Sequence, residues 1–195
     1  MSHQHVDPQC AVAHGYAPTP TADAVAHGYA PVPASARTLV AVFASPVAGF
    51  LLRYGSDVGY RPVLLEPDPA RAAAGSPGAE VVTSFAECAG PDTDVVVTDH
   101  HRGDLGPVLR DVLAGQAGWI GLMGSPRHVG PHVAALTELG VPAAEIARVH
   151  RPIGLNIGSK APAEIAIATI AGLIAEHNGC PGGFAFPAPA AQAAG

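Results

Sequence analysis

The chain has 195 residues, of which 48% are hydrophobic and only 13% are charged, with a formal net charge of -6 at pH 7. This hydrophobic content suits one domain of ordinary size, and the acidic balance with few, scattered Lys and Arg argues against a nucleic-acid partner. The amino terminus lacks the pattern of a signal peptide, and the longest apolar helical stretch, Ile165 to Ala175, is shorter than the ~20 residues that span a membrane.

The first 36 residues contain the sequence Ala-Val-Ala-His-Gly-Tyr-Ala-Pro at 11–18 and again at 24–31. Two copies of a Pro/Gly/Ala-rich unit are too few for a solenoid, so we expect residues 1–36 to be an irregular extension. The alternative, in which its histidines collect a metal, has no spacing that fixes ligand geometry. Residues 180–195 predict a second irregular tail. The three cysteines are widely separated along the chain, which favours a reducing, cytoplasmic setting.

Between these tails, residues 37–179 predict one domain in which short apolar runs alternate with helical stretches. The strands are expected at Thr38–Phe43, Pro62–Glu66, Glu80–Ser84, Asp94–Thr98 and Trp119–Met123. The helices are expected at Val47–Val58, Gly106–Leu113, Pro126–Leu139 and Pro162–His177. Continuous Val/Ile/Leu runs between helices predict a Rossmann-like, doubly wound α/β fold, with a mainly parallel sheet and helices on both faces. Ligands of such folds bind beyond the carboxyl ends of the strands.

The turn after the first strand is where a dinucleotide-binding protein places Gly-x-Gly-x-x-Gly/Ala. Phe43 and Ser45 replace the first two glycines, and their side chains obstruct the tight turn and the approach of a pyrophosphate. We therefore predict that NAD binds weakly or not at all. Glu66, after the second strand, occupies the position of the acidic residue that binds a ribose hydroxyl. A solvated loop carboxylate is an equally good interpretation.

Titratable side chains follow the fourth strand, in the segment Thr98-Asp99-His100-His101-Arg102. At the carboxyl end of a strand, Asp99 and His100 could bind a ligand or exchange protons near neutral pH. Alternatively, Asp99 caps the next helix and the histidines face water. Both interpretations remain open from the sequence.

The fifth strand is predicted to end on Gly124, with Ser125 as the N-cap and Pro126 as the first residue of a helix. The free backbone N–H groups of such a terminus, together with the Arg127 guanidinium, predict an anion site. His128 and His132 are four residues apart on the same helix. We interpret them as surface histidines and predict no metal site.

A glycine-rich polar loop precedes the last helix. Its candidate ligand residues are Gly154, Asn156, Ser159 and Lys160, whose donors could hold a pterin ring or a phosphate. The alternative is a turn and capping assembly in which Gly154 and Gly158 allow close packing. We expect an anionic ligand between the Ser125 helix terminus and this loop.

The sequence Pro-Ile-Gly-Leu-Asn-Ile-Gly at 152–158, followed by Ala-Pro-Ala-Glu-Ile-Ala at 161–166, is quite specific. With the Gly-Ser-Pro-Arg turn at 124–127, it resembles the C-terminal Rossmann-like domain of the XdhC/CoxI family, the maturation factors of molybdenum hydroxylases such as xanthine dehydrogenase and carbon monoxide dehydrogenase. The resemblance implies an accessory protein, a cofactor-insertion chaperone rather than an enzyme. Such a protein binds the molybdenum cofactor (molybdopterin) or a related nucleotide and aids its delivery to the hydroxylase apoenzyme.

The chain also departs from the family pattern. Family members commonly have Asp where Asn156 stands, and they usually carry an additional N-terminal domain with a cysteine linked to cofactor handling. Residues 1–36 are too short for that domain, so we expect a separate chain to supply it; a homo-oligomer is a further expectation. Two other functions remain open: a nucleotide-dependent oxidoreductase, or a non-catalytic interaction module with a vacant nucleotide crevice. No catalytic residue is predicted, because nucleophile-elbow, Ser/His/Asp and Walker patterns are absent from the sequence.

Overall fold

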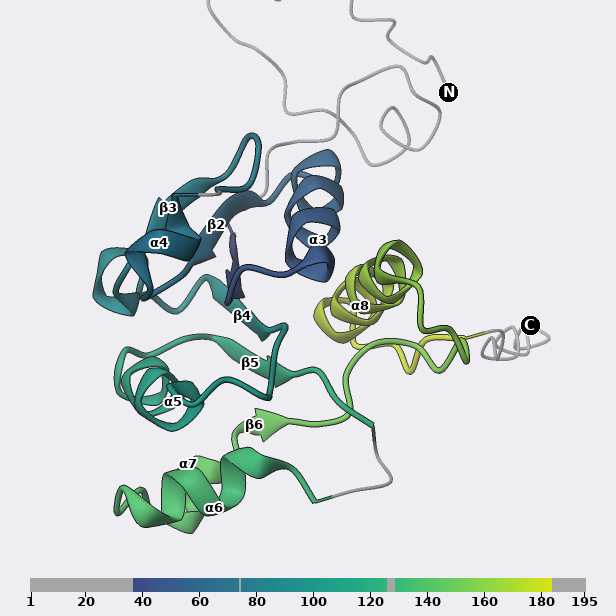
Figure 1. The fold of residues 1–195 in the computed structure, drawn as a ribbon. Coiled ribbons are helices and arrows are strands. Elements are labelled where there is room, and N and C mark those ends of the chain that lie inside the picture. The colour runs from purple at the N-terminus through teal and green to yellow at the C-terminus, as the bar shows by residue number, and fades with distance from the viewer. Residues whose placement is uncertain (1–36, 74, 126–128, 184–195) are drawn as a thin grey trace, which may run out of the picture. The chain divides into compact units, whose positions relative to one another are not determined.

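The computed structural model describes residues 37–73, 75–125 and 129–183. Within these ranges six strands form a parallel sheet in the order β3-β2-β1-β4-β5-β6 (Figure 1). The strands are β1 (Thr38–Val42), β2 (Arg61–Leu65), β3 (Glu80–Val82), β4 (Thr93–Val97), β5 (Trp119–Leu122) and β6 (Val149–His150). This is the strand order of a doubly wound Rossmann sheet, so the predicted fold class is confirmed.

Helices cover both faces of this sheet. They are α3 (Pro46–Asp57), α4 (Pro69–Ala72), α5 (Leu105–Ala114), α6 (Pro131–Glu138), α7 (Ala143–Ile146) and α8 (Pro162–His177), with a 3-10 helix at Phe85–Glu87. Figure 1 shows α3 and α8 side by side on one face and α5, α6 and α7 on the other.

The central strands β1 and β4 are buried on both faces, as their continuous apolar sequences predict. Within β1, Val40 and Val42 belong to the core beneath α5 and α6, whereas Leu39 and Ala41 belong to the core beneath α3 and α8. Successive side chains of a strand point to opposite faces, so one short apolar run contributes to both cores. Burial on both sides fixes the strands and therefore the loops at their carboxyl ends.

The predicted strands β1 to β5 agree with the structure to within one or two residues at each end, and the last helix agrees at both ends. The prediction for α6 is wrong at its start. Gly130 has extended backbone angles and α6 begins at Pro131, because the proline ring disfavours a helical conformation of the residue before it. Ser125 is therefore not the N-cap of this helix. Pro126, Arg127 and His128 lie outside the described residues.

A buried carboxylate joins several elements at the amino-terminal ends of the strands. Asp94 of β4 is fully buried and accepts hydrogen bonds from both the Nε and Nη2 atoms of Arg37. Its Oδ2 atom also lies 2.8 Å from Nε2 of His177, at the end of α8. Burial and this carboxylate together raise the pKa of the Tyr60 hydroxyl. The cluster fixes the end of α8 at the amino-terminal ends of the strands. Ligands of such folds bind at the opposite, carboxyl ends.

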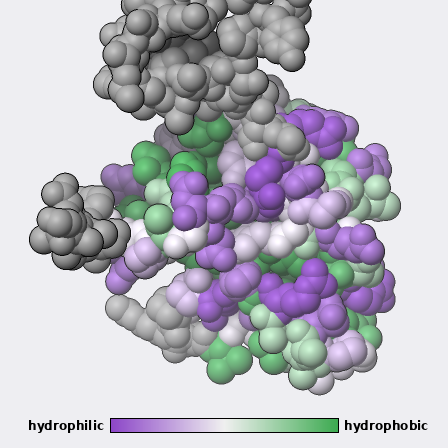
Figure 2. All heavy atoms as spheres, turned by 180° about the vertical axis from the view of Figure 1, so that it is seen from behind, coloured by the Kyte–Doolittle hydropathy of each residue, from purple (hydrophilic) through white to green (hydrophobic). Residues whose placement is uncertain are grey.

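Hydrophilic residues form most of the surface that Figure 2 shows, with smaller groups of hydrophobic residues between them. Among the described residues, eight large hydrophobic side chains are exposed: Val58, Val81, Val129, Val133, Leu139, Ile157, Ile167 and Ile174. No helix in the described ranges has the length and apolar character needed to cross a bilayer.

Candidate functional site

The strand order reverses between β1 and β4, and in open α/β sheets ligands bind beyond the carboxyl ends of the strands at this point. Here the two strand ends are joined by hydroxyl groups. Thr98 Oγ1 lies 3.1 Å from the carbonyl oxygen of Val42 and 2.9 Å from that of Phe43. Ser45 Oγ, which accepts from the N–H of Ala48 as the cap of α3, lies 2.8 Å from Thr98 Oγ1. These hydrogen bonds join the turn after β1 to the end of β4.

Phe43 occupies the position of the first glycine of a dinucleotide-binding turn. Its φ of 72° lies in the left-handed region that glycine enters without steric cost. The phenyl ring is fully buried, and the Arg102 guanidinium lies 4.4 Å from its centroid. The turn therefore keeps the backbone conformation expected of glycine while filling the adjacent space with an aromatic side chain.

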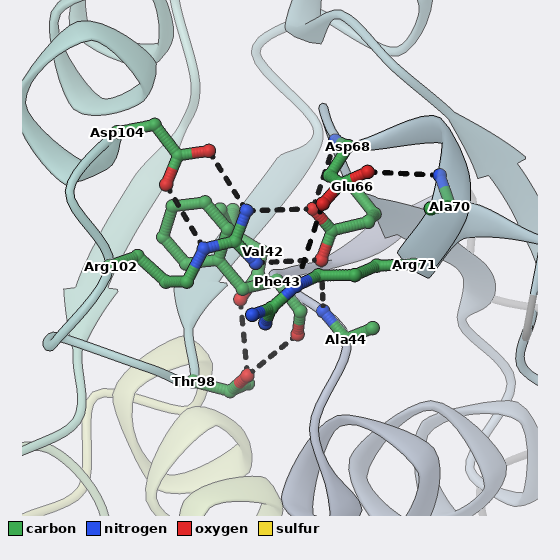
Figure 3. Close-up of polar contacts among 10 residues, drawn as sticks. All are labelled: Val42, Phe43, Ala44, Glu66, Asp68, Ala70, Arg71, Thr98, Arg102 and Asp104. Atoms are coloured by element: carbon green, nitrogen blue, oxygen red, sulfur yellow. Dashed lines mark hydrogen bonds and ion pairs between the residues drawn. The ribbon is translucent and has the colours of Figure 1, made fainter.

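Glu66 is the centre of the contacts shown in Figure 3. Its side chain is fully buried. Oε2 accepts from the N–H of Ala44 at 2.8 Å and from Nη1 of Arg102 at 3.0 Å. Oε1 accepts from the N–H of Asp68 at 3.1 Å and from Nη2 of Arg102 at 3.0 Å. Arg102 is held in turn by both carboxylate oxygens of Asp104.

These contacts correct the interpretation of Glu66 as a solvated loop carboxylate. Burial by itself would raise the pKa of Glu66, but the hydrogen bonds from Arg102, Ala44 and Asp68 outweigh burial and lower it. The carboxylate is therefore ionised at neutral pH. Because its oxygens already accept four hydrogen bonds, binding a ribose hydroxyl would require breaking contacts within the protein.

The residues of the β1 turn do not fit a dinucleotide. A pyrophosphate needs free backbone N–H groups at this turn, but the N–H of Ala44 donates to the Glu66 carboxylate. We expect calorimetric titration of the full chain with NAD to give no saturable binding near 10 μM, a dissociation constant that corresponds to about -7 kcal/mol. Binding at that strength or tighter would contradict the closed turn.

A second group of polar side chains lies beyond the carboxyl ends of β4, β5 and β6. Arg151, directly after β6, donates from Nη2 to the carbonyl oxygen of Ser125 at 2.9 Å. A Cβ atom on Gly124 would lie 2.8 Å from the same Nη2, so glycine there leaves room for the guanidinium. Burial lowers the pKa of His100, as do the nearby His101 and Arg151, while His100 also hydrogen-bonds to the backbone of Met123. Three loops thus meet at Arg151.

Some of the predicted site residues lie in the cluster around Arg151, and the others do not. His100, Gly124 and Ser125 are brought together by Arg151, whereas Arg127 lies outside the described residues. Asp99 accepts the N–H of His101 at 2.9 Å, and α5 begins after Asp104. The alternative that Asp99 caps that helix is therefore wrong.

The loop before α8 combines packing with exposed polar groups. Gly154, with a φ of +79°, packs on the α8 backbone: its Cβ would lie 3.1 Å from the Ala168 carbonyl carbon. Ser159 Oγ accepts the N–H of Ala161 at 3.0 Å, whereas Asn156 and Lys160 are exposed. Close packing thus accounts for Gly154, and a turn hydrogen bond involves Ser159. A ligand role for Asn156 and Lys160 stays a prediction.

This loop depends on a second glycine in α8. A Cβ on Gly172 would lie 3.0 Å from the Cα of Gly154. We expect Gly172→Ala to lower the free energy of unfolding by about 1 to 3 kcal/mol, the usual cost of overpacking, as measured by urea denaturation. The matched control is Gly49→Ala in α3, where nothing lies within 4 Å of the new atom and stability should rise by up to about 1 kcal/mol. Equal effects of the two changes would contradict this role of Gly172.

Sequence reasoning missed Arg151 because β6 has only two residues, too few to show periodicity. It also placed His132 on the surface, but the residue is only 5% exposed. The Gly130-Pro131 pair was the available signal for the helix start, and a helix beginning at Pro131 makes His132 its second residue. Arg102 could not be paired with Glu66, 36 residues away, without the tertiary structure.

Two pockets among the described residues, of about 450 and 230 Å³, have linings that do not include this cluster. The larger is lined mainly by residues 87–93, before β4, and the smaller by residues before β5 and around β6. Neither pocket is lined by a predicted site residue.

Residues 39–173 match the model of the XdhC Rossmann domain, more than half of the 195 residues. The chain belongs to the XdhC Rossmann domain family. The resemblance noted in the sequence is therefore confirmed. In this XdhC domain the turn after β1 has Phe43 in the left-handed region, and the N–H of Ala44 donates to the Glu66 carboxylate.

Two similar proteins are longer than this chain. YqeB of Escherichia coli K12, described as uncharacterized, is 37% identical over 95 residues, which are 48% of this chain and 17% of YqeB. A Bacillus halodurans crystal structure described as a xanthine dehydrogenase has a TM-score of 0.59 and 25% identity, covering 73% of this chain and 45% of that one. The chain thus spans less than half the length of either protein.

Proposed function

We propose that this chain is an accessory protein of a molybdenum hydroxylase of the xanthine dehydrogenase or carbon monoxide dehydrogenase type, which binds the molybdenum cofactor or a related nucleotide and aids its delivery. Membership of the XdhC Rossmann domain family is the observation that carries this proposal. The similarity to a protein described as a xanthine dehydrogenase supports the same enzyme class. A hydroxylase apoenzyme is the partner that this function implies.

The described residues support binding of an anionic cofactor at one place and oppose it at another. At the β1 turn the buried Glu66 carboxylate repels a phosphate and occupies the N–H of Ala44. Beyond β4 to β6, His100 and Arg151 supply donors for an anionic group. The closed turn also argues against a dinucleotide-dependent oxidoreductase. When bound, the molybdenum cofactor would bring its own redox chemistry, and this chain's residues would hold and orient it.

The test uses the full chain, a purified molybdenum hydroxylase apoenzyme and cofactor released from the holoenzyme. We expect native mass spectrometry to show the chain retaining the cofactor after desalting, and the loaded chain to restore hydroxylase activity faster than the same amount of free cofactor. Parallel spectra with NAD and FAD test the dinucleotide alternative. Absence of cofactor retention, together with an unchanged rate of activation, would contradict the proposed function.

A further inference from the structure

His132 contains a buried nitrogen that the protein does not satisfy. The residue is only 5% exposed, and its Nδ1 atom has no hydrogen-bond partner among the described residues. An unsatisfied buried polar atom destabilises the folded state, so such atoms are rare in folded proteins and indicate a missing partner such as water or a ligand. The imidazole is therefore available to an additional group.

The His132 ring and the Arg151 side chain meet at Gly130. A Cβ atom on Gly130 would lie 2.4 Å from Nδ1 of His132 and 3.1 Å from Cδ of Arg151. The two side chains come from different elements, α6 and the end of β6, so the sheet and the helix together position them. Glycine at 130 leaves the space in which they approach each other.

The charge of this cluster favours an anion. Burial lowers the pKa of His132, and the nearby Arg151 cation lowers it further. Arg151 has the same effect on His100, where only Asp99 acts in the opposite direction by charge. The Arg151 cation at the end of β6 thus acts on two imidazoles, one after β4 and one in α6. A bound oxyanion would offset the repulsion between Arg151 and protonated imidazoles, and would therefore raise the pKa of these histidines.

We propose that a phosphate group, of the kind that molybdopterin or a nucleotide carries, binds between His132 and Arg151. The inference rests on the proposed function and specifies which end of its ligand the protein holds. A guanidinium presents a planar set of donors that suits phosphate oxygens, and the imidazole adds a donor from the unsatisfied nitrogen. Phosphate recognition thus lies beyond β5 and β6 instead of at the β1 turn, which the Glu66 carboxylate fills.

The first experiment titrates the full chain, labelled with ¹⁵N-histidine, with inorganic phosphate and with pyrophosphate. We expect the His132 resonances to move saturably, and the pKa of His132 to rise by about one unit or more when the anion is bound. His177 is the internal control, because it contacts Asp94 at the amino-terminal ends of the strands, away from the proposed site. A His132 signal that does not respond would show that water satisfies Nδ1 and would overturn the proposal.

Variants locate the binding on the two side chains. We expect Arg151→Met and His132→Phe each to weaken pyrophosphate binding by about tenfold or more, the scale of one charged hydrogen bond. Arg110→Met is the matched control, since Arg110 is half-exposed and pairs with its neighbour Asp111; it should bind as the wild-type chain does. Because Arg151 also holds the Ser125 carbonyl, circular dichroism must show each variant folded. If folded Arg151→Met and His132→Phe variants bind like the control, the proposal is wrong.

The same variants separate this inference from the proposed function. Loss of pyrophosphate and of molybdopterin binding in Arg151→Met supports both. A wild-type His132 response to pyrophosphate without cofactor retention or hydroxylase activation supports the phosphate site and overturns the delivery function. Cofactor delivery that persists in both folded variants supports the function and overturns the site.

Discussion

Replacing Arg102 with methionine should lower the free energy of unfolding by about 3 to 5 kcal/mol, the usual cost of leaving a buried charge without its partner. The reason is the fully buried Glu66 carboxylate, which loses two of its four hydrogen bonds and its counter-charge. Methionine retains apolar contact with the Phe43 ring, so packing is the smaller part of the effect. Urea denaturation, monitored by circular dichroism, measures the change in the free energy of unfolding.

Two further variants isolate the ion pair. Arg110→Met removes an exposed pair, with side chains 50% and 62% accessible, and should cost less than about 1 kcal/mol. The double variant Glu66→Gln/Arg102→Met should recover part of the loss, because no buried charge then remains unpaired. An Arg102 variant as stable as the Arg110 variant would show that this pair is not important for the fold.

The effect of Arg102→Met should also depend on pH. The Glu66 pKa is lowered in the folded chain, so its stabilising contribution is complete above the ordinary glutamate pKa of about 4.3 and disappears as the pH falls through the folded value. In the variant, burial without Arg102 raises the pKa of Glu66, and protonation relieves the unpaired charge. The stability difference between the two proteins should therefore narrow from pH 7 toward pH 4. A constant difference would contradict this explanation.

The second large effect is expected from Asp94→Ala, near the amino-terminal end of β4. Asp94 is fully buried and joins Arg37 to His177 at the end of α8. Its removal takes away the main partner of the Arg37 guanidinium, which is 27% exposed and also pairs with Asp92. We therefore expect a cost of about 1.5 to 3 kcal/mol, the scale of a hydrogen bond to a charged group. Thermal and urea unfolding of the variant measure this loss.

Asp92→Ala is a closely matched control, because Asp92 also pairs with Arg37 but is 71% exposed, with 3.7 Å between the charged atoms. The change should cost less than about 1 kcal/mol. If both substitutions have the same effect, the buried cluster does not hold α8 to the sheet.

The fold was predictable because its signals are local. Runs such as Leu39 to Val42 and Val95 to Val97 are buried on both faces, and nothing but a covered parallel sheet accommodates them between helices. The family was also readable from contiguous residues, at 152–158 and 161–166. The start of α6 was mispredicted although its signal was local: Pro131 excludes a helical Gly130.

The contacts of the candidate site were not predictable in this way, because they join segments distant in the sequence. By itself the sequence determined the sheet and the family, whereas weak NAD binding at the β1 turn stays a prediction. Only the tertiary structure decided that Glu66 is buried against Arg102, and that His132 and Arg151 meet at Gly130. The physical reason is that hydrophobic periodicity reports the burial of an element, whereas hydrogen bonding of a polar side chain depends on which loops the strand order brings together.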